Sequence, residues 1–164
     1  MSAIRLMLAF VLALGLTGGA DAVDELGYRI FTKNKGSFDD VAENVKDAIV
    51  NRGFVVDYVG YFNKMLERTA EATGTVTQAG SKSPYKNAQY VQFCPAKLTH
   101  EAVNVSPFGI ANCPIAVFVY ETTYEAGKIQ VGFRLPVSSP SKRVREINQQ
   151  LVTLLQEIAT EATK

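Results

Sequence analysis

The chain has 164 residues and a formal net charge of +1, from 17 Lys and Arg against 16 Asp and Glu. Its basic residues are scattered, apart from a short cluster at 142–145, so the composition excludes the concentrated basic surface of a nucleic-acid-binding protein. A chain of this length predicts a single domain with a hydrophobic core.

The first residues are typical of an export signal. A short basic start ending at Arg5 precedes the apolar run 6–16, and small residues follow up to Ala22, where we expect cleavage. Because the hydrocarbon layer is ~30 Å thick and a helix rises ~1.5 Å per residue, this run is too short to span a membrane. We therefore expect a cleaved signal peptide at 1–22, a single mature domain at 23–164 with no membrane span, and a periplasmic or secreted location.

The first half of this domain predicts two strands and two helices in alternation. The clearest element is a helix with Ser37 before its start, apolar residues at three- and four-residue spacing, and Gly53 after its end. The flanking strands are rich in β-branched and aromatic residues. The expected elements are a strand at 26–32, a helix at 38–52, a strand at 54–60 and a helix at 62–74, followed by a surface loop at 75–87.

The second half predicts three more strands and two helices. Pro95 is suited to a first helical turn, and the last helix carries an apolar stripe that favours packing on the sheet over a coiled-coil zipper. The expected elements are strands at 88–94, 115–120 and 128–135, with helices at 95–104 and 141–163. Together they predict an α+β fold, with a sheet of four to five strands and about four helices packed on it.

Several segments resemble one bacterial family. They are Ser37-Phe38, Gly53-Phe54, the Phe-Cys-Pro-Ala-Lys-Leu of 93–98, the Cys-Pro-Ile-Ala-Val-Phe-Val-Tyr-Glu of 113–121, and Leu135-Pro136. The chain resembles the family known as domain of unknown function number 302, in particular its exported members, over roughly residues 28–136. The resemblance implies a small α+β domain with helices on a sheet and no agreed activity, and its pattern includes the two cysteines.

Cys94, His100 and Cys113 lie close together in the sequence, and each cysteine is followed by proline. They are both of the cysteines and the only histidine of the chain. The sequence contains no phosphate-binding loop, His-Glu-x-x-His motif or serine elbow. If the protein has a chemical site, we expect it here.

The first interpretation of the cysteines is a disulfide, which an oxidising compartment would allow. It would stabilise the fold by roughly 3 kcal/mol. It requires that the strands ending at Cys94 and beginning at Cys113 run antiparallel, because a parallel crossover would place the thiols a strand length apart.

Two other interpretations stay open. Thiolate and imidazole are good ligands for a metal or haem, so Cys94, Cys113 and His100 form a candidate metal site. However, His100 would lie about 240° around a regular helix from Cys94, towards the exposed side. Alternatively, Cys94 at a helix start is a candidate reactive thiol, because the helix dipole stabilises a thiolate.

A further pair of carboxylates, Glu121 and Glu125, lies beside Tyr120 and Tyr124. Such a pair is of interest as a general acid and base. Because these residues flank a predicted hairpin turn, we expect them to face solvent.

The leading functional hypothesis is a non-enzymatic periplasmic binding or accessory protein, with its site near Cys94 and Cys113 and with a homodimer as one arrangement. It requires no cofactor, and the ligand or protein partner is not specified. The alternatives are a thiol-active redox or sulfur-transfer protein using the same cysteines, and a structural interaction module that dimerises through the last helix, where Leu151 and Leu154 lie.

Overall fold

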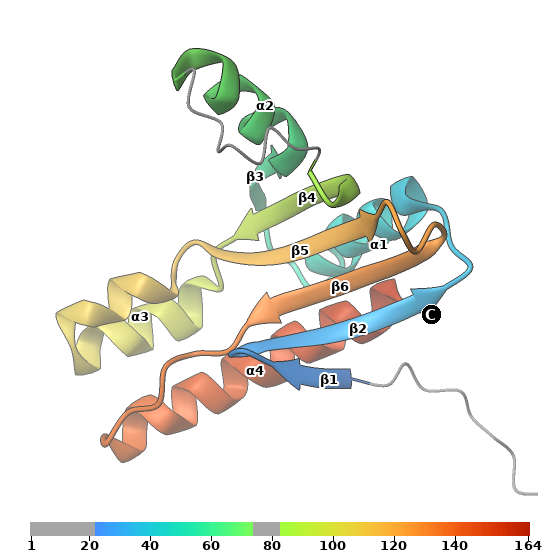
Figure 1. Cartoon of the computed structure of the whole chain (residues 1–164). Helices are drawn as coiled ribbons and strands as arrows, with labels where there is room; N and C mark the ends of the chain where they lie inside the picture. The colour runs from blue at the N-terminus through green and yellow to red at the C-terminus, as the bar shows by residue number, and fades with distance from the viewer. Residues whose placement is uncertain (1–21, 74–82) are drawn as a thin grey trace, which may run out of the picture.

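The computed structural model describes residues 22–73 and 83–164, and within them one antiparallel sheet of six strands packs with helices (Figure 1). The strand order is β1-β2-β6-β5-β4-β3. In chain order the elements are β1 (Ala22–Glu25), β2 (Tyr28–Asn34), α1 (Phe38–Val50), β3 (Val56–Tyr61), α2 (Phe62–Thr73), β4 (Tyr85–Phe93), α3 (Ala96–Val105), the 3-10 helix η1 (Pro107–Asn112), β5 (Ile115–Thr122), β6 (Lys128–Arg134) and α4 (Lys142–Ala162). The predicted α+β class is confirmed.

The described part of the sheet has one strand more than the four to five predicted. Residues Ala22–Glu25 pair antiparallel with β2, and Leu26 and Gly27 form the turn between the two strands. Both turn residues have positive φ, 50° for Leu26 and 83° for Gly27, as tight hairpin turns require. The predicted strand began at Leu26 because leucine is an unusual residue in such a turn.

Helices α1 and α4 cover one face of the sheet (Figure 1). Val45 and Ile49 of α1 and Leu155 and Ile158 of α4 are buried in the same apolar cluster as Val119 of β5. The prediction that the last helix packs on the sheet is therefore confirmed. Most of its apolar stripe, including Ile147, Leu151, Leu155 and Ile158, is buried within its own chain.

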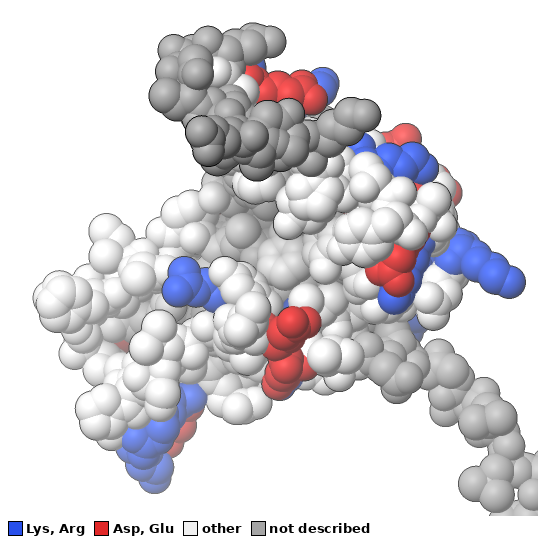
Figure 2. Space-filling view, viewed as in Figure 1, with Lys and Arg blue, Asp and Glu red and all other residues white. Residues whose placement is uncertain are grey.

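The opposite face of the sheet carries aromatic side chains. A series of ring contacts, with centroids 5.5 to 6.2 Å apart, runs through Tyr28, Phe118, Tyr120, Tyr85 and Phe62. Gly132 of β6 lies against the Phe118 ring, and a Cβ added there would be 2.5 Å from the ring's Cζ atom. Only glycine leaves room for this ring. Figure 2 shows few charged side chains over this face.

Some predictions concern residues outside the described ranges. The predicted signal peptide at 1–22 lies there except for its last residue, as does most of the predicted loop at 75–87. Strand β4 begins at Tyr85, earlier than predicted. Among the described helices, none is long and apolar enough to cross a membrane.

Candidate functional site

Cys94 and Cys113 form a disulfide, with the sulfurs 2.05 Å apart and the Cα atoms 5.0 Å apart. Strands β4 and β5 pair antiparallel, and Phe93 lies opposite Ile115 in their register. The end of β4 and the start of β5 therefore meet at the same end of the sheet, as the disulfide requires. Because the two strands are antiparallel, the connection through α3 and η1 is not a parallel crossover and returns to the end of the sheet that it left (Figure 1).

Thr99 links the disulfide to the α3–η1 segment that lies between the two cysteines. Its Oγ1 lies 3.6 Å from the sulfur of Cys94 and donates a hydrogen bond of 3.4 Å to the carbonyl oxygen of Asn112. The first turn of α3 is thus joined to the end of η1, next to Cys113.

His100 is exposed on α3 and pairs with a neighbour on the same helix. Its Nδ1 lies 3.1 Å from Nδ2 of Asn104. The described residues include no group of three or more His, Cys, Asp or Glu side chains that could hold a metal ion. Metals bind cysteine as thiolate, and the sulfurs of Cys94 and Cys113 are bonded to each other. A metal or haem site at these residues would require the disulfide to be reduced. For the reduced protein, such a site stays a prediction.

Glu121 is buried, with only 3% of its surface exposed, so the prediction that it faces solvent is wrong. Its carboxylate accepts hydrogen bonds from the backbone N–H of Gly127, from Lys86 Nζ and from Asn87 Nδ2. The Gly127 hydrogen bond is the main cause that lowers the pKa of Glu121, and Lys86 and Asn87 add to it against the opposing effect of burial. With these three hydrogen bonds, the Glu121 carboxylate stabilises the hairpin. Glu125, in contrast, is exposed and forms an ion pair with Lys128.

A cleft opens beside the disulfide, where β5 and β6 separate. These two strands pair only as far as Val117 and Phe133. Beyond that point β5 continues to pair with β4, and β6 continues to pair with β2. The separation leaves a cavity of about 910 Å³, within the size range of small-molecule sites.

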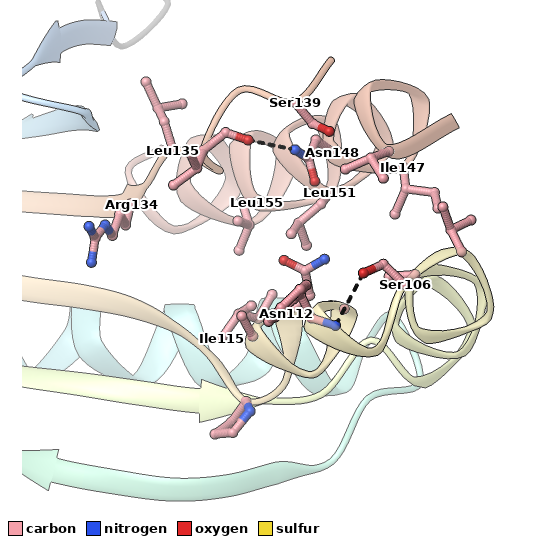
Figure 3. A pocket seen from close by; sticks show the side chains of 18 of the residues that line it. Ser106, Asn112, Ile115, Arg134, Leu135, Ser139, Ile147, Asn148, Leu151 and Leu155 are labelled. Carbon is pink, nitrogen blue, oxygen red and sulfur yellow. Dashed lines mark hydrogen bonds between the residues drawn. The ribbon is translucent and has the colours of Figure 1, made fainter. Parts of the chain in front are cut away.

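The cleft has two walls (Figure 3). The end of α3, η1 and the start of β5 form one wall, and the end of β6, the segment after it and α4 as far as Leu155 form the other. Leu151 and Leu155 point from α4 into the cavity, and the side-chain amide of Asn112 faces them from η1. An ion pair of 2.8 Å between Arg143 and Glu101 joins α4 to α3.

The lining is mostly apolar, and large apolar side chains at its rim face solvent. Phe108 of η1 is 87% exposed and Val137, after β6, is 78% exposed. Exposed apolar groups around a cavity are typical of a ligand or partner site. The polar side chains among the described lining residues are Ser106, Asn112, Ser139, Ser141, Asn148 and Tyr28, and Arg134 is the only charged one.

The position of the η1 wall depends on Gly109. A Cβ added at this residue would lie 2.4 Å from the backbone carbonyl carbon of Ala102, so only glycine allows η1 to pack this closely on α3. Ser106 stabilises the start of η1, because its hydroxyl accepts a 3.3 Å hydrogen bond from the backbone N–H of Phe108.

The sequence pattern did not indicate the polar and charged residues that line the cleft, such as Asn112, Arg134 and Asn148. A signal was present in the two rim residues. Phe108 and Val137 are large apolar residues outside the predicted helices and strands, where such residues have no core to enter.

No family model matches the chain, and no curated protein matches it. Among solved structures, the fold is similar to the crystal structure of an uncharacterized conserved protein DUF302 from Bacillus stearothermophilus. The TM-score is 0.65 at 13% sequence identity, and the match covers 85% of this chain and 100% of that chain. At this identity the similarity shows the fold alone. The chain has a DUF302-like fold, in agreement with the resemblance of its sequence.

Proposed function

We propose that this chain is an exported, non-enzymatic binding protein, and that its ligand occupies the cleft between η1 and α4 beside Cys113. The observation that carries this proposal is the separation of β5 from β6, which leaves an apolar cavity of about 910 Å³ in an otherwise continuous sheet. An apolar ligand in this cavity would cover the rim side chains that now face water, such as Phe108 and Val137, and that burial is favourable.

The disulfide supports this function by holding one wall in place. It joins the end of β4 to the residue that follows η1, so the α3–η1 connection is closed at both ends. A wall held in position before the ligand arrives loses less conformational entropy on binding. This role also agrees with the proposed export, since disulfides persist in oxidising compartments.

The test uses a neutral dye that fluoresces in apolar surroundings, Nile red, with the purified protein lacking residues 1–22. We expect saturable binding at one site. Val105→Glu should weaken this binding at least about tenfold, because it places a carboxylate in the apolar lining.

The matched control is Val103→Glu on the same helix. Val103 is 37% exposed and Val105 is 42% exposed, so both variants are expected to fold, but only Val105 lines the cleft. Val103→Glu should bind the dye within about twofold of the wild type. Absence of dye binding to the wild type, or equal binding by the two variants, contradicts the proposal.

A second candidate function is thiol–disulfide exchange, because Cys94 and Cys113 are both half-buried and not sealed in the core. A dithiol reductant would give two electrons and two protons to the disulfide and itself become a disulfide. The measurement is the reduction potential in glutathione buffers. A value below about −300 mV indicates a structural disulfide and rejects this candidate, whereas a clearly higher value supports it.

A further inference from the structure

Arg134 stands out among the arginines of the described chain because its guanidinium group has no hydrogen bond or ion pair with another described residue, although its backbone pairs with β2. It is the last residue of β6 and is exposed at the edge of the cleft. Each of the other described arginines donates at least one hydrogen bond: Arg29, Arg52, Arg68, Arg143 and Arg145. A guanidinium group without a partner beside an apolar cavity is available to a ligand.

The position of Arg134 defines one end of the cleft. Figure 3 shows it at the end where Leu155 lies, and Ile147 lies towards the other end. The lining residues of α4 run from Val144 to Leu155, which corresponds to about 16 Å along the helix axis. The cleft is therefore long and apolar, with a cation at one end.

We propose that the ligand is an amphipathic carboxylate, a free medium-chain fatty acid, whose carboxylate pairs with Arg134 and whose alkyl chain lies along Leu155 and Leu151. The proposal rests on the proposed binding function. A guanidinium group matches the two oxygens of a carboxylate in a bidentate arrangement. The described lining contains no Asp or Glu that would repel an anion or compete for Arg134.

The first experiment compares two ligands with the same chain, decanoate and decanol, by isothermal titration calorimetry. At low salt we expect decanoate to bind about tenfold more tightly than decanol, because only decanoate can pair with Arg134. The advantage is no larger than this because Arg134 is exposed and water weakens the ion pair. The advantage should shrink as the salt concentration rises, because salt screens exposed charges. The affinity should also increase about fourfold for each methylene group added from octanoate to decanoate.

The second experiment uses the variant Arg134→Gln. It should lower the affinity for decanoate about tenfold and leave the affinity for decanol within about twofold, because only the carboxylate uses the charge. The matched control is Arg68→Gln, an exposed arginine of α2 that does not line this cleft, and it should change neither affinity.

The outcomes separate this inference from the function on which it rests. If decanol and Nile red bind but decanoate has no advantage, or if Arg134→Gln affects both ligands equally, the carboxylate assignment is overturned and the binding function stands. If neither the dye nor either ligand binds, the binding function itself is overturned. If a phospholipid with one acyl chain binds much more tightly than decanoate and depends on Arg134, the ligand is not a free fatty acid.

Discussion

The carboxylate of Glu121 accepts a 2.7 Å hydrogen bond from the backbone N–H of Gly127, across the turn that joins β5 to β6. The same carboxylate accepts hydrogen bonds of 3.0 Å from Lys86 and 3.1 Å from Asn87, near the start of β4. One buried side chain thus connects the hairpin turn to the neighbouring strand, at the end of the sheet opposite the disulfide.

This arrangement predicts a pH-dependent stability. The pKa of Glu121 is lower in the folded chain than its usual value of about 4.3 in an unfolded chain. The ionised Glu121 therefore contributes fully to the free energy of unfolding above the unfolded-state pKa. This contribution is lost as the pH falls through the lower, folded-state pKa. Between about pH 6 and pH 3, the urea midpoint of the wild type should fall more than that of Glu121→Gln. Equal losses in the two proteins would contradict this role.

At pH 7 the same substitution should destabilise the protein by about 1 to 3 kcal/mol, because hydrogen bonds to a charged group are lost. The exposed Glu125→Gln, which loses only a surface pair with Lys128, should cost less than about 1 kcal/mol. Urea unfolding monitored by circular dichroism measures both values.

Removal of the disulfide should lower the free energy of unfolding by about 3 kcal/mol, because a sequence separation of 19 residues constrains the unfolded chain. The measurement is urea unfolding of the protein with and without a dithiol reductant. The double variant Cys94→Ser/Cys113→Ser should resemble the reduced wild type and should not respond to the reductant. A thiol assay that finds two free thiols in protein isolated from the periplasm would overturn the structural role.

Gly109→Ala should both destabilise the fold and weaken dye binding. The added Cβ would lie 2.4 Å from the backbone of Ala102, so η1 must move away from α3, at a cost of about 1 to 3 kcal/mol. Moving η1 changes one wall of the cleft. Unfolding by urea and Nile red titration measure the two effects. A variant that keeps wild-type stability and wild-type dye affinity would show that this contact does not position the wall.

Export predicts a defined N-terminus for the mature protein. Expressed with its full sequence in a bacterium that has a periplasm, the chain should begin at Val23, which intact mass and N-terminal sequencing of the periplasmic fraction would show. Cleavage there leaves Val23, Asp24 and Glu25 of β1 paired with β2. Recovery of the uncleaved chain from the cytoplasm would contradict this expectation.

The sequence by itself determined much of the fold. The apolar spacing of α1 and α4 predicted which faces of these helices are buried, because an amphipathic helix repeats every 3.6 residues whatever it packs against. The alternating and apolar segments predicted five of the described strands for the same local reason. The β1 strand was missed because its turn places Leu26 at a positive φ, which its residue type does not indicate.

The site depended on tertiary structure. Whether Cys94 and Cys113 meet is decided by the direction of β5 relative to β4, and no local pattern encodes strand direction. Glu121 looked like a solvated residue of a hairpin turn until the register placed Gly127 and Lys86 around it. The cleft depends even more on contacts between residues that are far apart in the sequence. It exists because β5 and β6 stop pairing at Val117 and Phe133, and its charge comes from an arginine whose side chain has no partner among the described residues.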